Sequence, residues 1–161
     1  MFQKSCLSLI HFHLQIYLPN GWRDAIAESD QQWISRQLFK DQKLVHPLSL
    51  WYRPPLPPPI PTRPPKPHLY FARRLFVWMP YRIWAYKFVC SGPGCNKKQL
   101  TGAGPYKTVR KVLDIDEFYY LIGEVLECTN CKKKFISWSK EILDQLDESH
   151  RRQFRVILTH K

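Results

Sequence analysis

The chain has 161 residues and a formal net charge of +12, because 25 Lys and Arg outnumber 13 Asp and Glu. Hydrophobic residues make up 44% of it, enough to bury a core, which excludes wholesale disorder. Only six glycines argue against a glycine-rich phosphate-binding enzyme. No stretch approaches the roughly 20 apolar residues of a transmembrane helix. The composition predicts a basic globular protein whose partner is acidic: nucleic acid, an anionic surface or an acidic protein.

The first thirty residues are predicted to be an extension outside the main domain. The apolar run at residues 6–17 is interrupted by His11, His13 and Gln15, and no small-residue cleavage site follows it. We therefore expect an intracellular protein. Residues 22–40 show apolar side chains four apart and predict one or two short helices, with Asn20 and Asp30 as their N-caps. Residues 31–53 form the helical lead-in of the domain in this scheme.

Residues 54–67 contain nine prolines in fourteen positions. Because proline fixes φ and lacks an amide donor, this segment is expected to be extended or polyproline II. A stiff strap packed on its own domain, or a linker, is the favoured interpretation. The alternative is a ligand for another protein: residues 58–63 fit the pattern that SH3 domains bind, and residues 54–57 fit a WW-domain ligand.

Residues 68–161 are predicted to form the main domain, and the fold class is α+β. Its expected elements are strands at residues 75–79, 83–90, 109–115, 120–128, 135–138 and 155–159, with one helix at 139–149 capped by Ser139. This pattern predicts a small zinc-ribbon-like β core with a C-terminal helix, preceded by the proline strap and the short N-terminal helices. The sequence stops without a terminating signal, so we expect a domain truncated at its C-terminus.

Four cysteines form two close pairs, Cys90 with Cys95 and Cys128 with Cys131, separated by 32 residues. Four thiolates in two tight turns are the ligand set of one structural zinc ion. Iron in the same sulfur cage is an alternative, because geometry alone does not separate the two metals. Two disulfides would leave Cys6 unpaired, and a thioredoxin-like site would need a helix after Cys128, where the sequence predicts a strand.

Acidic residues are absent between Asp41 and Asp114, a stretch of 72 residues that holds thirteen Lys or Arg. A positive potential of this extent favours a polyanion, and Tyr106 and Tyr119 are candidate exposed aromatics beside it. The alternative is an ordinary solvated basic face. The candidate nucleic-acid-binding residues are Arg73, Arg74, Arg82, Lys97, Lys98, Lys107, Arg110, Lys111, Lys132, Lys133 and Lys134.

The carboxylates at positions 114, 116 and 117 do not suggest an active site. They adjoin Ile115 and Phe118, and no base, nucleophile or phosphate loop stands near them in the sequence. They are interpreted as loop or helix-start acids, and we expect no enzymatic activity.

Five blocks of the sequence accompany the two cysteine pairs: QQWISRQLF (31–39), RLFVWMP (74–80), LTGAG (100–104), SWS (137–139) and FRVILT (154–159). Together they resemble a zinc-ribbon-like domain of unknown function, family 6729. The resemblance covers residues 31–161. It implies that the four cysteines bind the metal. It also implies a fish or other animal protein of mobile-element ancestry, similar in style to the cysteine clusters beside certain transposases and in an HMG-box protein. It implies no biochemical activity.

Two functions follow from these observations. The first is a structural zinc module that binds nucleic acid, DNA in preference, within a nuclear or transposon-derived protein. The second is a zinc-stabilised protein-interaction or scaffold domain without nucleic-acid binding. One contiguous basic face would favour the first, and basic residues dispersed over several faces would favour the second.

Overall fold

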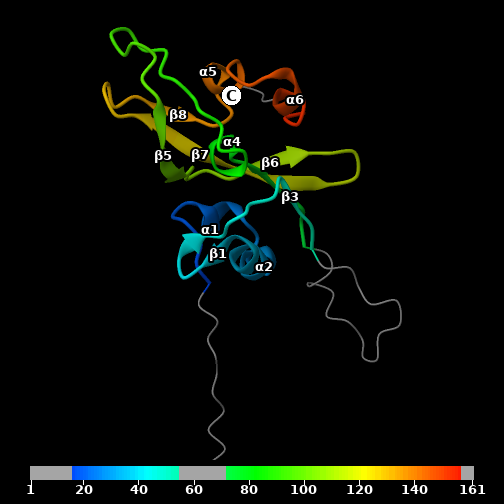
Figure 1. The fold of residues 1–161 in the computed structure, drawn as a ribbon. Helices are drawn as coiled ribbons and strands as arrows, with labels where there is room; N and C mark the ends of the chain where they lie inside the picture. Colours follow the sequence, from blue (N-terminus) through cyan, green and yellow to red (C-terminus); the bar gives the residue numbers. More distant parts are fainter. Residues whose placement is uncertain (1–15, 55–71, 157–161) are drawn as a thin grey trace, which may run out of the picture.

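A computed structural model describes residues 16–54 and 72–156, which fold around a six-stranded sheet (Figure 1). The long central strand β7 (Phe118–Cys128) pairs with every strand of this sheet except β3. Parallel β4 and antiparallel β6 flank its first half, and antiparallel β5 and β8 flank its second half. The bounds of the flanking strands are Trp51–Tyr52 for β3, Leu75–Trp78 for β4, Leu100–Pro105 for β5, Arg110–Leu113 for β6 and Lys134–Ile136 for β8.

Both faces of the sheet are covered, which explains why β7 is a nearly continuous apolar run. Tyr120 and Ile122 point to one face and pack against α1 (Trp22–Ala25) and α2 (Glu28–Leu38). Tyr119 and Leu121 point to the opposite face, with the cysteines, α5 (Lys140–Leu143) and α6 (Glu148–Arg151). In Figure 1, α1, α2 and the hairpin of β1 (Phe39–Lys40) and β2 (Lys43–Leu44) lie below the sheet, and α5 and α6 lie above it.

The α+β class is confirmed, and so are strands close to the predicted ranges 75–79, 109–115, 120–128 and 135–138. The two N-terminal helices are also present, but their predicted caps are wrong. The N-cap positions are Gly21 and Ala27, whereas Asp30 lies within α2 and is buried.

The predicted strand at 83–90 is wrong. The proline at position 80 begins the short helix α4 (Pro80–Ile83), because its fixed φ suits the first helical turn. Ala85 then adopts a left-handed conformation (φ 51°), and the segment after it pairs only through an isolated bridge between Val89 and Gln99.

The single helix predicted at 139–149 is also wrong, because the chain forms two short helices, α5 and α6. The first helix ends at Leu143, and Asp147 caps the second, accepting a hydrogen bond from the His150 amide at 3.1 Å. Between the helices, the Gln145 side chain bonds to both the amide and the carbonyl of Val89, at 2.8 and 3.1 Å. This contact fastens the loop before the first cysteine pair to the helical layer.

The predicted strand at 155–159 is not present at Arg155 and Val156, and the remainder of that range lies outside the described residues. Residues 55–67 of the proline-rich segment also lie outside them. None of the helices in the described ranges is long and apolar enough to cross a membrane.

Gly123 occupies the middle of β7 because no side chain fits there. A Cβ at this position would lie 2.5 Å from Cζ3 of Trp138 and 2.6 Å from Oγ of Ser137. The Ser137 hydroxyl donates to the Trp78 carbonyl at 2.7 Å and accepts from the Glu124 amide at 3.1 Å. The glycine thus lets the segment after β8 pack directly on the central strand.

Candidate metal centre

The sheet brings the two cysteine pairs together at one end of β7. Cys128 is the last residue of β7 and pairs with Leu100, the first residue of β5. The loop that carries Cys90 and Cys95 ends just before Leu100, so this single pairing joins the first cysteine pair to the second. The loop is closed by the Cys90 amide, which donates to the Lys98 carbonyl at 2.8 Å.

The second pair lies in the turn between β7 and β8. The amide of Cys128 donates to the carbonyl of Lys133 at 3.0 Å, and the amide of Lys132 donates back to Cys128 at 2.9 Å. The turn is tight enough that Lys132 adopts φ 61°, in the left-handed region. Because the turn is short, Cys131 lies beside the loop that carries Cys90 and Cys95 rather than farther along β7.

The four sulfurs form one compact cluster. The Cys90 and Cys131 sulfurs are 3.7 Å apart, the Cys95 and Cys128 sulfurs are 3.9 Å apart, and all four lie within 4.8 Å of one another. A disulfide would need about 2.05 Å, and all four thiols are free. A tetrahedral site with metal–sulfur bonds of about 2.3 Å separates its sulfurs by roughly 3.8 Å. The four cysteines are therefore arranged as a site that could hold one metal ion.

Groups around the cluster are placed to support thiolate ligands. The Gly92 amide donates to the Cys90 sulfur at 3.3 Å, and the Asn130 side-chain amide lies 3.6 Å from the Cys95 sulfur. A Cβ on Gly92 would lie 3.3–3.6 Å from three of the sulfurs. The absence of a side chain at this position leaves room for the cluster, and its amide remains directed at a ligand atom.

The ionisation of the thiols is strongly unequal. Backbone amides, first that of Cys131, favour the Cys128 thiolate and lower its pKa to about 7. The Gly92 amide favours the Cys90 thiolate, but burial and the neighbouring sulfurs outweigh it and raise the pKa of that thiol. Four adjacent thiolates cannot all be charged without a compensating cation, so this donor set is suited to a bound metal ion.

Five of the candidate basic residues surround the centre, all of them exposed. Lys133 lies 4.0 Å from Glu141, and Lys134 lies 3.6 Å from Glu127. The other three, which form no ion pair within the described ranges, are Lys97, Lys98 and Lys132.

The remaining candidates do not share one face. Arg82 is 3.3 Å from the buried carboxylate of Glu124. Arg73 and Lys111 both lie over the Phe118 ring, which packs on the α1 and α2 side of the sheet. Arg74 and Arg110 lie on the opposite face, and Lys107 is exposed in the loop between β5 and β6. The eleven residues are therefore distributed over both faces of the sheet.

The proposed aromatic candidates are less accessible than expected. Tyr119 is buried and Tyr106 is half-buried, with its ring edge against Trp138. The exposed aromatic of the sheet is instead Trp51, on the two-residue strand β3. Sequence reasoning missed it because so short a strand has no periodicity of its own.

The three carboxylates considered above lie in the turn between β6 and β7. Asp114 is 2.8 Å from Arg74, and Glu117 is 2.5 Å from Arg73. The guanidinium of Arg74 holds the pKa of the Asp114 carboxyl below its usual value. Asp114 and Glu117 therefore lie in ion pairs with the two arginines that precede β4, whereas no ion pair of Asp116 is found among the described residues.

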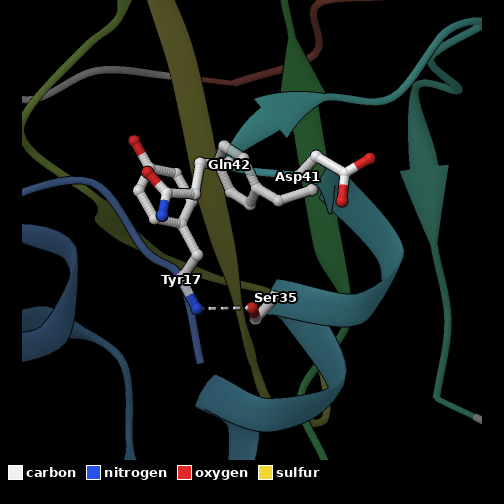
Figure 2. A pocket seen from close by; sticks show the side chains of 5 residues that line it. Tyr17, Ser35, Asp41 and Gln42 are labelled. Carbon is white, nitrogen blue, oxygen red and sulfur yellow. Dashed lines mark hydrogen bonds between the residues drawn. The ribbon is translucent and has the colours of Figure 1, made fainter. Parts of the chain in front are cut away.

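A separate hollow lies beside the turn between β1 and β2 (Figure 2). Tyr17 donates its amide to the Ser35 hydroxyl at 3.0 Å, and the Asp41 carboxylate is directed away from that serine. Asp41 and Gln42 have φ values of 50° and 62°, typical of a tight hairpin turn. This hollow gathers no group of charges or nucleophiles and is distant in sequence from all four clustered cysteines.

Neither a curated protein nor a solved structure matches the chain. A family model for a domain of unknown function matches residues 22–161, so the match begins at α1 rather than at residue 31. The match includes all four clustered cysteines and every strand described above. The chain belongs to this family, DUF6729.

Proposed function

We propose that the chain is a structural zinc module that binds nucleic acid, DNA in preference, within a nuclear or transposon-derived protein. It acts by binding and not by catalysis. The observation that carries the proposal is a set of exposed cations between residues 72 and 113 that form no ion pair with any other described residue. These residues are Lys87, Lys97, Lys98, Lys107, Arg110 and Lys111.

Zinc is the proposed ion because all four donors are sulfur and no ligand position is left for water or substrate. Such a site contributes to folding rather than to catalysis. Zinc with four thiolates carries a net charge of −2, which the lysines of the two turns offset. The metal would join β5, β7 and β8 at their common end.

The proposal is tested with the full zinc-loaded chain and labelled duplex DNA and single-stranded RNA, by fluorescence anisotropy over a series of salt concentrations. We expect log K to fall steeply with log salt, because each neutralised phosphate releases a counterion. A variant with Lys97, Lys98 and Lys107 changed to Ala should bind more weakly and with a shallower slope. Lys40→Ala with Lys43→Ala, on the β1–β2 hairpin, is the control for loss of positive charge elsewhere on the chain. No binding at low salt would overturn the proposal.

A protein-interaction role is the second candidate, and two observations favour it. The first is that the eleven candidate basic residues are distributed over both faces of the sheet, the arrangement expected for this role. The second is a pair of exposed apolar side chains. Leu113 and Ile115, near the turn between β6 and β7, are 86% and 96% exposed. Two large apolar side chains exposed near one turn offer an apolar surface to another protein. If nucleic acid does not bind, this candidate predicts self-association by light scattering that Leu113→Ser with Ile115→Ser abolishes.

A further inference from the structure

A hollow of about 560 Å³ lies on the sheet face that also carries α5 and α6, and it continues into a smaller one. The two share Trp51, Tyr119, Arg74 and Arg155. They are bounded by β3, by β6 and by the segment after α6. The volume is within the range of sites that hold a nucleotide-sized ligand.

Trp51 is a rigid aromatic surface in this hollow. Its indole stacks on the buried Phe76 ring, with centroids 4.6 Å apart and planes 26° apart, and Tyr119 lies edge-on at 5.0 Å. The side chain is nevertheless 41% exposed. An indole held on one side by the core and open on the other is prepared to stack on a flat ring without losing conformational freedom.

Arginines surround this tryptophan. In the pairing of β3 with β4, Trp51 lies opposite Phe76, which places the next alternate residues, Arg53 and Arg74, on the same face. Arg110 reaches the hollow from β6, and Arg155 reaches it from the segment after α6. Guanidinium groups bind phosphate oxygens in pairs and also stack on bases.

The net charge of the side chains that line the hollow is positive, even though one of them is a carboxylate. Asp114 lines the hollow and is 2.8 Å from Arg74, which Glu117 also contacts at 3.3 Å. Arg53, Arg110 and Arg155 form no ion pair with the residues that the structure describes. Lys111 contributes less, because its ammonium lies over the Phe118 ring on the other face.

We propose that this hollow binds single-stranded nucleic acid, with an unpaired base stacked on Trp51 and the adjacent phosphates on Arg53, Arg110 and Arg155. The inference rests on the proposed function and specifies its ligand. Duplex bases are stacked on one another and cannot offer a face to Trp51, whereas an unpaired base can. The metal centre lies at the far end of β7 from this hollow, since β6 pairs with the first residues of β7 and Cys128 is its last.

The experiment compares an oligo-dT strand, the RNA strand oligo-U and a duplex DNA of equal length, bound to the full zinc-loaded chain. Trp51→Ala should weaken single-strand binding roughly ten- to a hundredfold, and Trp51→Phe should restore most of it. Arg110→Ala with Arg155→Ala should reduce the salt slope for the single strand by about 0.7 for each lost phosphate contact. Lys40→Ala with Lys43→Ala, on the opposite face, is the charge control.

The outcomes separate the two proposals. If the unaltered chain binds none of the three probes, the proposed function is wrong and the inference falls with it. If it binds duplex and single strand equally, and neither Trp51→Ala nor the arginine pair alters single-strand binding, the inference is wrong and the proposed function stands. Melting curves check that the variants fold. If Trp51→Ala does not fold, the variant Arg110→Ala with Arg155→Ala decides the question.

Discussion

The hydroxyl of Tyr120 donates to the Asp30 carboxylate at 3.0 Å and accepts from the Ala27 amide at the same distance. One phenol on the central strand thereby joins the sheet to the first turn of α2. Asp30 is buried, and burial raises the pKa of its carboxyl. The tyrosine hydroxyl compensates part of the cost of burying that acid.

Tyr120→Phe is predicted to lower the free energy of unfolding by about 1–3 kcal/mol, because it leaves a buried carboxylate oxygen and a backbone amide without this partner. Denaturant titration measures the change. Tyr119→Phe is the control, since no hydrogen bond of its hydroxyl is found among the described residues, and it should cost far less. Equal losses for the two variants would contradict the role assigned to Tyr120.

Cys128→Ser is predicted to abolish stoichiometric metal binding and to unfold the region of β5, β7 and β8, because metal-binding energy at such a site is folding energy. A chelator added to the unaltered chain should have the same effect. Circular dichroism and metal analysis are the measurements. Cys6→Ser, outside the clustered set, should leave the metal content unchanged. A Cys128→Ser protein with a full cooperative melt would show that the cluster is not structural.

Gly92→Ala is predicted to weaken metal binding while leaving all four ligands in place. The added Cβ would lie 3.3 Å from the Cys90 sulfur, so that sulfur must move by a few tenths of an ångström, whereas the Cys95 sulfur at 3.5 Å would be in ordinary contact. Competition with a chromogenic chelator measures the affinity, and the Co²⁺ spectrum reports the tetrahedral geometry.

Gly94→Ala separates crowding from backbone strain. No atom lies within 4 Å of a Cβ at Gly94, but its φ of +75° is unfavourable for alanine, by about 1 kcal/mol. It should therefore lower stability without distorting the cobalt spectrum. A distorted spectrum for Gly94→Ala alone would mean that loop conformation, not space beside the sulfurs, controls the site.

The features that sequence predicted well are those decided locally. The central strand is a long apolar run, and the cysteine spacing within each turn dictates two close thiol pairs. In contrast, β5 has the sequence LTGAGP, with two glycines and a proline, which disfavours a strand. It is a strand because β7 offers a partner edge, and this tertiary pairing is not encoded in the local sequence.

The positions of the basic residues were unpredictable for a similar reason. Arg110 and Lys111 are adjacent in β6, so their side chains point to opposite faces of the sheet. Without the pairing of β6 and β7, the sequence does not determine which of these two side chains lies on which face of the sheet. Arg110 lines the larger hollow, Arg53 lines the smaller one and Arg155 lines both, although the three are far apart in sequence, so their proximity depends entirely on the tertiary fold.

Glu124 is a buried carboxylate in the middle of β7, and its titration gives a further prediction. It accepts a hydrogen bond from the Tyr81 amide at 2.9 Å and lies 3.3 Å from Arg82. Burial raises its pKa from 4.5 to about 7, and the attraction of Arg82 only partly opposes this. Because the folded state holds the proton to higher pH than the unfolded state does, the free energy of unfolding falls as pH rises from about 4.5 to about 7.

Glu124→Gln should remove this contribution. The stability of the variant relative to the unaltered chain is predicted to increase with pH across that window, by at most about 1.4 kcal/mol per pH unit, and to be constant above it. Chemical denaturation from pH 5 to pH 8 at fixed metal load measures the difference, which cancels the pH dependence of the metal site. Glu127→Gln, on the same strand beside Lys134, should retain the slope of the unaltered chain. A difference between Glu124→Gln and the unaltered chain that does not vary with pH would show that Glu124 stays ionised throughout, held by Arg82.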